Sequence, residues 1–115
     1  MQPVERPRPP CLMNPAQNIV DLLGKSYVLE IIYTLTHRNS SIRFNELKRK
    51  MTVTATTLSR RLEDLVSSDL VLREVYSEVP ARVEYSLSEK GRSFSPILRN
   101  LFRWIDENYG TGDSI

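Results

Sequence analysis

Apolar residues recur at intervals of three and four along most of the chain, which is the spacing of amphipathic helices. The pattern predicts five helices, over about residues 14–23, 25–36, 44–51, 55–67 and 89–109. The ends of the first helix are well marked, because Asn14 is a good N-cap, Pro15 suits the first turn and Gly24 suits the end. Pro96 lies within the last predicted helix and indicates either a later start or a kink.

Between the last two predicted helices the hydrophobic period changes to two residues. Residues 83–87 alternate apolar and polar, as a half-buried strand does, and residues 70–76 are rich in strand-forming types. Residues 77–82, which include Pro80, connect the two as a hairpin loop, and Ile42 lies in a short extended piece. The expected fold is therefore mainly α with a small β-hairpin, in the element order of a winged helix-turn-helix with an added terminal helix.

Length and composition indicate a single globular domain, with 115 residues of which 40% are hydrophobic and 26% charged. Four prolines among the first ten residues predict a flexible Pro-rich arm over 1–13, followed by the domain over 14–109 and a disordered tail over 110–115. No apolar run approaches the roughly 18 residues of a membrane span, and the first residues lack the apolar stretch of a secretory signal. We therefore expect a cytoplasmic protein without membrane contact.

Candidate chemistry for an enzyme or a metal site is sparse. Cys11 and His37 are the only residues of their types, so one chain can form neither an internal disulfide nor a four-ligand zinc site. The sequence contains no Gly-rich phosphate loop and no Cys–His arrangement for nucleophilic catalysis. It therefore predicts neither an enzyme nor a cofactor, and it identifies no small-molecule effector.

Charge is segregated along the chain in a way that the net charge of +2 conceals. Residues 38–61 contain seven basic residues and one acidic residue, Glu46, whereas acidic residues are in excess elsewhere. A concentrated positive segment in a nearly neutral protein favours a polyanionic partner, although a solvated basic face with no partner has the same composition. An alternative function, a winged-helix module that contacts protein and not operator DNA, would not need this segregation.

The predicted helix over 55–67 is the candidate for DNA binding. Leu58, Leu62 and Leu65 anchor one side of it, so the opposite side faces outward, and a helix of this kind fits the major groove with its first turns at the base edges. The residues that we expect to contact bases are Thr56, Thr57, Ser59 and Arg60. Those that we expect to contact the phosphate backbone are Arg43, Lys48, Arg49, Lys50, Thr54 and Arg61. In the hairpin, Arg82 is expected to contact an adjacent minor groove or its phosphates.

Several of these residues have an alternative role within the protein. Thr57 neighbours an anchoring leucine and could pack against the core. Arg61 is as well placed to pair with a nearby carboxylate as with a phosphate, and Arg82 is flanked by two possible partners, Glu78 and Glu84. The basic residues that end the third predicted helix could be merely solvated.

The last predicted helix carries more apolar surface than one thin domain can cover, and the first helix adds to it. A self-complementary patch of this kind predicts a homodimer. The residues that we expect at the dimer interface are Ile19, Leu22, Leu23, Leu98, Leu101, Phe102, Trp104 and Ile105. Trp104 has an alternative role, in which it seals the core of one protomer. A two-fold dimer would place its two DNA-reading helices one DNA turn, roughly 34 Å, apart and would bind a palindromic operator in double-stranded DNA.

Four segments of the sequence resemble the HxlR-type regulators, a branch of the MarR-like winged-helix group. They are DLLGK (21–25), RFNEL (43–47), LSRRL (58–62) and VYSEVPARVEYSL (75–87). The resemblance covers about residues 14–109 and implies a homodimeric, DNA-binding transcription regulator whose first and last helices form the dimer interface. It also implies that the fourth helix enters the major groove and that the wing, with Arg82, lies against DNA.

Two positions depart from the pattern of this family. Many members have Cys-Pro at the start of the first helix, and in some of them the thiol senses oxidants or electrophiles. Here Asn14 and Pro15 occupy that place, and the only thiol, Cys11, lies three residues earlier in the Pro-rich arm. Cys11 is therefore the candidate redox residue, although an exposed position in a mobile arm would give it no special reactivity. The second departure is Thr56, at a position where the family often has lysine.

Overall fold

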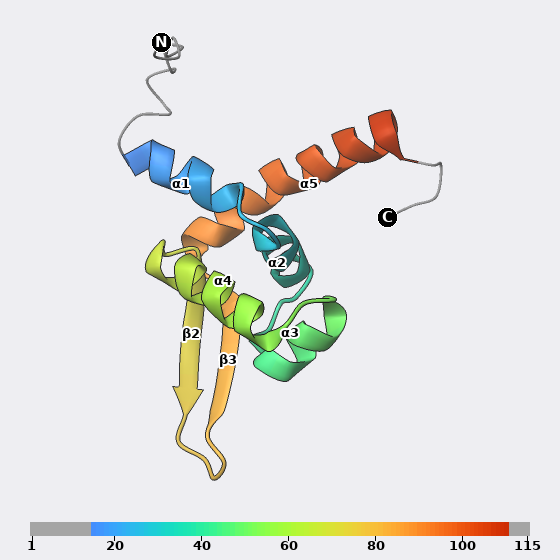
Figure 1. The fold of residues 1–115 in the computed structure, drawn as a ribbon. Coiled ribbons are helices and arrows are strands. Elements are labelled where there is room, and N and C mark those ends of the chain that lie inside the picture. The colour runs from blue at the N-terminus through green and yellow to red at the C-terminus, as the bar shows by residue number, and fades with distance from the viewer. Residues whose placement is uncertain (1–14, 111–115) are drawn as a thin grey trace, which may run out of the picture.

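The computed structural model describes residues 15–110, which form five helices and a small three-stranded sheet (Figure 1). The elements in chain order are α1 (Pro15–Leu23), α2 (Val28–Thr36), β1 (Ile42–Arg43), α3 (Phe44–Lys50), α4 (Ala55–Ser67), β2 (Val71–Tyr76), β3 (Arg82–Leu87) and α5 (Glu89–Tyr109). The predicted fold class and element order are thereby confirmed. The predicted arm with Cys11, the cap at Asn14 and the tail beyond Gly110 lie outside the described residues.

The turn between α1 and α2 is longer than the sequence predicts, since α2 begins at Val28 and not near Lys25. Tyr27 has a left-handed backbone conformation, with a φ of 71°. A residue inside a right-handed helix cannot adopt this conformation, so the helix starts only after Tyr27. Gly24 ends α1 by donating its N–H to the carbonyl oxygen of Val20 at 3.1 Å.

The start of α5 is fixed against the base of the hairpin. The hydroxyl of Ser88 accepts a hydrogen bond from the N–H of Gly91 at 3.0 Å, which caps the helix. A Cβ atom on Gly91 would lie 2.2 Å from the carbonyl oxygen of Leu70, so only glycine allows this close approach. The helix begins at Glu89 and runs on through Pro96, so this proline does not delay its start.

The hydrophobic core lies between α2, α4, α5 and the base of the hairpin. Its fully buried side chains are Val28, Ile31, Ile32, Leu35, Ile42, Leu47, Leu58, Leu62, Leu65, Val71 and Leu98. Burial of one such side chain contributes about 1.5–3 kcal/mol, so the three leucines of α4 fix which side of that helix faces the core. A buried hydroxyl also joins α2 to α5, because Thr36 Oγ1 donates to the carbonyl of Ile32 at 2.8 Å and lies 3.0 Å from Ser95 Oγ.

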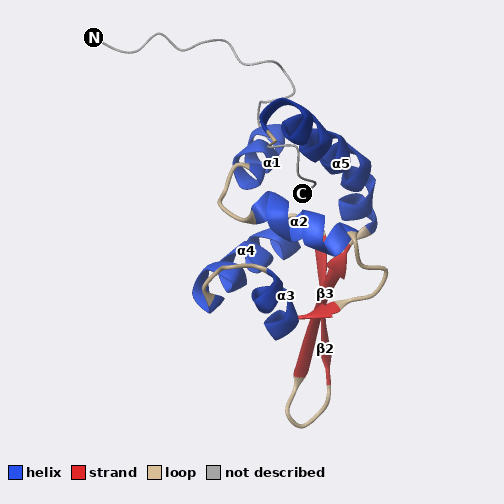
Figure 2. Cartoon of the chain, turned by 90° about the vertical axis from the view of Figure 1, so that its right-hand side faces the viewer, coloured by secondary structure: helices blue, strands red, loops and turns tan. Residues whose placement is uncertain are grey.

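The sheet has the strand order β1-β3-β2 and is antiparallel throughout. β2 pairs with β3 from Val71 opposite Leu87 at the base to Tyr76 opposite Arg82 at the loop end. The base of this hairpin is covered by helices, and its loop end projects away from them as a wing (Figure 2). The helices that cover the base of the hairpin include α4, so α4, α3 and the wing lie next to one another (Figure 2).

Candidate nucleic-acid interface

α4 presents a polar face to the outside of the molecule. Leu58, which is fully buried, lies on the opposite side of the helix from this face. Thr56, Ser59 and Arg60 are exposed, as the sequence predicts. Exposed hydroxyl groups and one arginine on the first two turns of a projecting helix are suited to the edges of bases in a major groove.

Thr57 differs from the other predicted base contacts because it is half-buried and its hydroxyl is hydrogen-bonded within the protein. Its N–H donates to Thr54 Oγ1 at 3.2 Å, and its Oγ1 accepts from the Thr54 hydroxyl at 3.0 Å. These two residues therefore form the N-terminal cap of α4, and a cap of this kind contributes about 1 kcal/mol. The hydroxyl of Thr57 is used within the protein, which leaves Thr56 and Ser59 as the outward hydroxyl groups of the first two turns of the helix.

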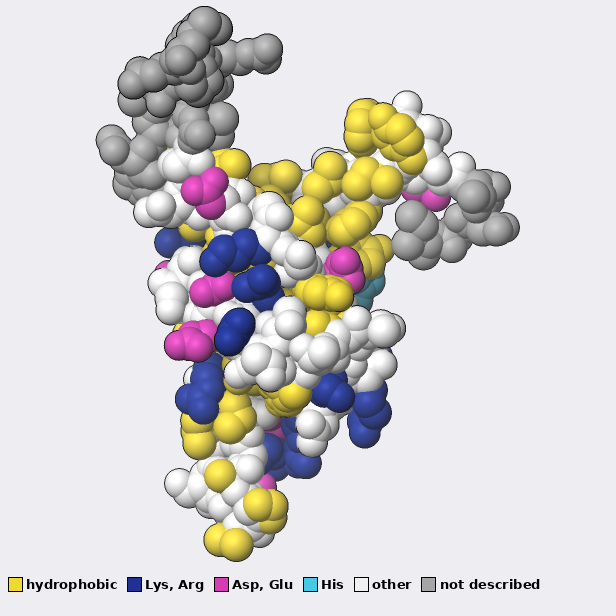
Figure 3. All heavy atoms as spheres, viewed as in Figure 1, with side chains coloured by type: hydrophobic (Ala, Val, Ile, Leu, Met, Phe, Trp, Pro, Cys, Tyr) yellow, Lys and Arg dark blue, Asp and Glu magenta, His cyan; other side chains and the backbone are white. Residues whose placement is uncertain are grey.

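The C-terminal end of α3 is basic and lies next to the turn that leads into α4. Lys48, Arg49 and Lys50 fill its last turn, and Arg49 and Lys50 are exposed. Lysine and arginine at a helix C-terminus also interact favourably with the helix dipole, so part of their role is local. Figure 3 shows Lys and Arg side chains gathered over α3 and α4.

The one acidic residue of this basic segment is neutralised within the protein. Glu46 Oε2 accepts a hydrogen bond from Arg38 Nη1 at 2.6 Å, and Arg38 also donates to the carbonyl of Ser41. The pair removes one positive and one negative charge from the surface near α3. The remaining cations of α3, which are Lys48, Arg49 and Lys50, therefore determine the sign of the potential there.

Arg61 is held by the protein on the side of α4 that faces the α1–α2 turn. Its Nε donates to the carbonyl of Ser26 at 3.1 Å, and its Nη1 lies 3.6 Å from Asp64 Oδ2. The same carboxylate oxygen is 3.2 Å from Lys25 Nζ, a residue that the sequence did not single out. Of the two roles predicted for Arg61, the described structure thus shows the pairing with a carboxylate.

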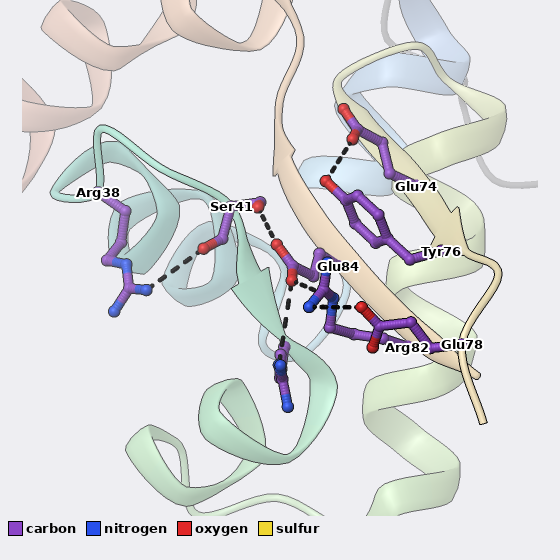
Figure 4. A network of polar contacts seen from close by, with 8 residues as sticks. Arg38, Ser41, Glu74, Tyr76, Glu78, Arg82 and Glu84 are labelled. Carbon is purple, nitrogen blue, oxygen red and sulfur yellow. Dashed lines mark hydrogen bonds and ion pairs between the residues drawn. The ribbon is translucent and has the colours of Figure 1, made fainter. Parts of the chain in front are cut away.

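Arg82 lies at the start of β3 and is also held within the protein (Figure 4). Its Nη1 is 3.0 Å from Glu78 Oε1, and its Nε is 2.8 Å from Glu84 Oε2. The second contact is an ion pair without hydrogen-bond geometry, because Nε makes no hydrogen bond within the described residues. The guanidinium carbon also lies 4.1 Å from the ring centroid of Tyr76, which is a cation–π distance. The structure therefore has Arg82 in the alternative role that the sequence left open.

Glu84 is the centre of this network and connects β3 to β1. Its carboxylate accepts a hydrogen bond from the Ser41 hydroxyl and lies 3.9 Å from Arg43 Nε, besides its contact with Arg82. On the neighbouring strand, the hydroxyl of Tyr76 donates to Glu74 Oε2 at 2.8 Å, and this hydrogen bond raises the pKa of Tyr76. The signal in the sequence is the two-residue spacing of Arg82 and Glu84, which places both on one face of a strand.

Two clefts flank the wing and contain basic side chains. The first, of about 640 Å³, separates α3 from the tip of the wing, and Arg43 and Arg49 line it. The second, of about 390 Å³, separates α4 from the hairpin and is lined by Ser59, Glu63 and Arg73 among others. Arg73 is exposed and makes no ion pair with another described residue. The sequence analysis did not identify Arg73. Its spacing of two residues from Val71 places both side chains on the same face of β2, and this spacing is the signal that could have found it.

An exposed apolar surface runs along α1 and α5, on the side of the molecule away from the wing. Figure 3 shows hydrophobic side chains gathered along α5, whose C-terminal half extends past the other elements in Figure 1. The exposed large apolar residues of the two helices are Ile19, Val20, Ile97, Trp104 and Tyr109. Trp104 keeps 53% of its surface exposed and makes an edge contact with Tyr109, so it does not seal the core of the protomer.

Two residues expected at the dimer interface are instead buried within the protomer, and a third packs partly against it. Leu22 and Leu98 are buried in the core, because each lies on the side of its helix that faces α2 or the hairpin. Phe102 packs edge-on against Tyr33 of α2, with ring centroids 4.7 Å apart, and lines a cleft of about 800 Å³ between α2 and α5. Leu23, Leu101 and Ile105 are half-buried. The apolar spacing of the sequence did not separate the inner faces of α1 and α5 from their outer faces.

His37 and the acidic residues form no metal site in the part of the chain that the structure describes. Nδ1 of His37 makes a hydrogen bond with the carbonyl of Tyr33 at 2.8 Å, and its ring lies 4.4 Å from the Tyr33 ring. No group of three or more His, Cys, Asp or Glu residues within 15–110 could hold a metal ion. Among these residues, no helix combines the length and the apolar character that crossing a membrane requires.

Comparison with known proteins decides the family. The sequence profile of the HxlR-like helix-turn-helix family matches residues 22–113, which is most of the chain. The chain belongs to the HxlR-like helix-turn-helix family. An HTH-type transcriptional regulator of Halalkalibacterium halodurans is 43% identical to it over 90 residues, which is 77% of this chain and 79% of that protein.

Solved structures agree with this assignment. A MarR-family transcriptional regulator from Porphyromonas gingivalis superposes with a TM-score of 0.75 at 29% identity, covering 91% of this chain and 99% of that one. The reduced form of the transcriptional regulator YodB from Bacillus subtilis superposes with a TM-score of 0.71 at 30% identity, covering 88% and 99%. This HxlR-like protein is therefore a DNA-binding transcriptional regulator of the helix-turn-helix type, and its relatives are regulators and not enzymes.

Proposed function

We propose that this HxlR-like regulator binds a palindromic operator as a homodimer, with α4 of each protomer in a major groove. The observation that carries the proposal is the orientation of α4. Three buried leucines hold the helix from behind, and Thr56, Ser59 and Arg60 project from its first turns. These turns are the part of a recognition helix that reaches base edges.

The side chains on α4 suit base recognition in different ways. Threonine and serine hydroxyls are short, so they let the helix approach the floor of the groove and can donate to or accept from several bases. Arg60 is longer and can bind the O6 and N7 atoms of a guanine with two hydrogen bonds. We therefore assign the main share of sequence discrimination to Arg60.

Contacts with the phosphate backbone come from residues around α4. Arg49 and Lys50 are exposed on α3, and Arg43 is exposed at the end of β1 just before it. Arg73 is exposed on the hairpin, on the other side of the recognition helix. Cations on both sides of a helix in the major groove match the two phosphate chains that border the groove. Such contacts fix the position of the protein and supply affinity that depends on salt. The wing lies along the neighbouring minor groove or its phosphates.

The exposed apolar surface of α1 and α5 supports the homodimer. Side chains such as Ile97 and Trp104 are exposed on α5 at a spacing of seven residues, which places them on one face of the helix. A contiguous apolar surface of this kind marks an interface, and a second copy of the same chain offers a matching apolar surface. The same two-fold axis would relate the two α4 helices and hence the two halves of the operator.

The proposal is tested by selecting bound duplexes from a random pool with the purified protein. We expect a palindrome whose half-site centres are separated by about one turn, roughly 10 base pairs. Arg60→Ala should lower affinity for the selected duplex by about tenfold or more, because a bidentate arginine–guanine pair supplies about 1–3 kcal/mol. Arg103→Ala removes the same charge from an exposed position on the projecting half of α5 and is the matched control.

Two outcomes would contradict the proposal. If the wild-type protein binds no duplex even at low salt, the winged domain contacts protein instead of DNA. If Arg60→Ala and Arg103→Ala weaken binding equally, α4 does not read the bases.

A further inference from the structure

We infer that Arg82 is a positioning residue of the wing and not a contact to DNA, and that Glu84 is the residue through which it acts. The inference deepens the proposed function and rests on it, because a wing must bind near DNA for its position to matter. An arginine at the loop end of a wing would otherwise be well suited to bind in a minor groove, where the negative potential is enhanced. The contacts of Arg82 argue against that use.

Three groups of the protein surround the Arg82 guanidinium. Glu78 lies 3.0 Å from one edge, Glu84 lies 2.8 Å from another, and the ring of Tyr76 covers the plane at 4.1 Å. The side chain is only 26% exposed. A phosphate that approaches Arg82 would therefore have to compete with two carboxylates that already pair with it.

Withdrawal of Arg82 would leave Glu84 in an unfavourable environment. The Glu84 side chain is 16% exposed, and Arg82 is its close cationic partner. The next cation, Arg43, lies 3.9 Å away and is 62% exposed. Loss of an ion pair costs more free energy when the carboxylate is poorly solvated than when it is exposed to water. The transfer of Arg82 from Glu84 to a DNA phosphate is therefore disfavoured.

The network connects the wing to the segment that leads into α3. Glu78 belongs to the loop, Tyr76 to β2, and Glu84 binds the hydroxyl of Ser41, which immediately precedes β1. Figure 4 shows these side chains meeting across the sheet on one face. Arg82 thereby ties the loop end of the hairpin to the body that carries α3 and α4, and so fixes where the wing lies relative to a bound duplex.

Arg43 is the cation that this region offers to a phosphate. It lies next to the same network, and its one ion pair with a described residue is the long contact with Glu84. It lines the cleft between α3 and the wing tip together with Arg49. The two arginines thus have separable roles. Arg43 should contribute to the salt dependence of binding, and Arg82 should not.

The test measures affinity for a random-sequence duplex of about 30 base pairs, roughly three turns. Fluorescence anisotropy is recorded at several potassium chloride concentrations from about 50 to 200 mM. Arg43→Ala should reduce the slope of log K against log[salt] by about 0.9 for each phosphate that the variant no longer neutralises. Arg82→Ala should weaken binding by about tenfold at every salt concentration and leave the slope unchanged.

Glu84→Gln provides the second arm, with Glu74→Gln as its matched control. The two glutamates lie directly opposite each other in the hairpin, and both substitutions remove one negative charge, but Glu74 contacts Tyr76 and not Arg82. Glu84→Gln should bind about tenfold more weakly than Glu74→Gln, because the wing loses its anchor although Arg82 is retained. The double variant Arg82→Ala with Glu84→Gln should be no weaker than the weaker single variant.

The opposite results would overturn the inference. If Arg82 contacts DNA, Arg82→Ala lowers the salt slope as Arg43→Ala does, and Glu84→Gln tightens binding by releasing Arg82. Thermal unfolding of each variant, followed by circular dichroism, shows whether weaker binding comes from a displaced wing or from loss of the fold. If Arg82→Ala does not fold, the isosteric variant Glu84→Gln provides the test in its place. Absence of any binding by the wild-type protein would instead refute the proposed function itself.

Discussion

Arg61 in α4 donates a hydrogen bond from Nε to the carbonyl oxygen of Ser26, which lies 35 residues earlier in the chain, at 3.1 Å. The bond joins α4, the proposed recognition helix, to the turn between α1 and α2. Lys25 of that turn reaches back to Asp64 of α4 at 3.2 Å, so two polar contacts connect the same pair of segments. Neighbouring arginines of α4 therefore have different roles, since Arg61 holds the helix and Arg60 projects from it.

The first prediction compares these neighbours. Arg61→Ala should lower the free energy of unfolding by about 1 kcal/mol, because it removes a charged hydrogen bond from a side chain that is 24% exposed and partly screened by solvent. For a domain of this size that is a fall in Tm of roughly 4–8 °C. Arg60→Ala should leave Tm unchanged while it weakens DNA binding. Thermal unfolding followed by circular dichroism checks both, and an equal Tm for the two variants would contradict the role assigned to Arg61.

The second prediction concerns the cap of α4. Thr54→Ala should lower the free energy of unfolding by about 1 kcal/mol, because the N–H of Thr57 loses its acceptor. Thr54→Ser retains the hydroxyl and should unfold close to the wild-type midpoint in urea. A Thr54→Ser protein as unstable as Thr54→Ala would show that the methyl group, and not the hydroxyl, matters at this position.

The third prediction concerns the contact between α5 and the base of the hairpin. Gly91→Ala should be strongly destabilising, by about 1–3 kcal/mol or more, because the new methyl group would collide with a backbone carbonyl that cannot move away easily. Gly24→Ala is the control, since a Cβ there meets nothing nearer than 3.6 Å. Chemical denaturation of both variants measures the difference. Similar unfolding midpoints would mean that α5 can shift away from Leu70 without loss.

The fourth prediction concerns self-association. Ile97→Glu places a charge on the exposed apolar face of α5 and should convert the proposed dimer into a monomer, as measured by sedimentation velocity. Val79→Glu introduces the same charge at a fully exposed apolar residue of the wing tip and should leave the dimer intact. Dissociation in both variants would point to a general effect of charge, and dissociation in neither would place the interface elsewhere.

The fifth prediction separates contacts to the backbone from contacts to bases. Arg49→Ala should weaken binding to the selected duplex and to a scrambled duplex by the same factor, because phosphate contacts carry little sequence information. The slope of log K against log[salt] should fall by about 0.9 for each phosphate that Arg49 neutralises in the wild-type complex. A change in base preference in competition experiments with this variant would count against a role limited to the backbone.

Local patterns in the sequence were sufficient to predict where α4 and α5 begin and end. Both run over the predicted residues, because apolar spacing fixes the buried face and a hydroxyl residue just before each helix, Thr54 or Ser88, fixes its start. The same patterns failed at the start of α2. Tyr27 is not a residue type that favours a left-handed conformation, so nothing in the local sequence signals the extra turn.

The sequence left the place of individual side chains undecided where a partner distant in the chain determines it. The carbonyl of Ser26 that binds Arg61 comes from another element, and a spacing rule cannot identify it. The burial of Leu98 likewise depends on which side of α5 faces α2, and a broad apolar stripe leaves that side undefined. For Arg82 the sequence identified one partner and missed another. The two-residue spacing indicated Glu84, but no spacing rule indicated that Tyr76 packs against the guanidinium.

The position of Trp104 gives the molecule a built-in optical reporter. It is the sole tryptophan of the sequence, and its indole lies half in solvent on the outer face of α5. Indole emission shifts to shorter wavelength when water is removed from around the ring, and here no second indole of the same chain obscures that shift. Burial of this face against another molecule would therefore be visible as a blue shift on titrating the unlabelled protein, with no dye attached and no residue replaced.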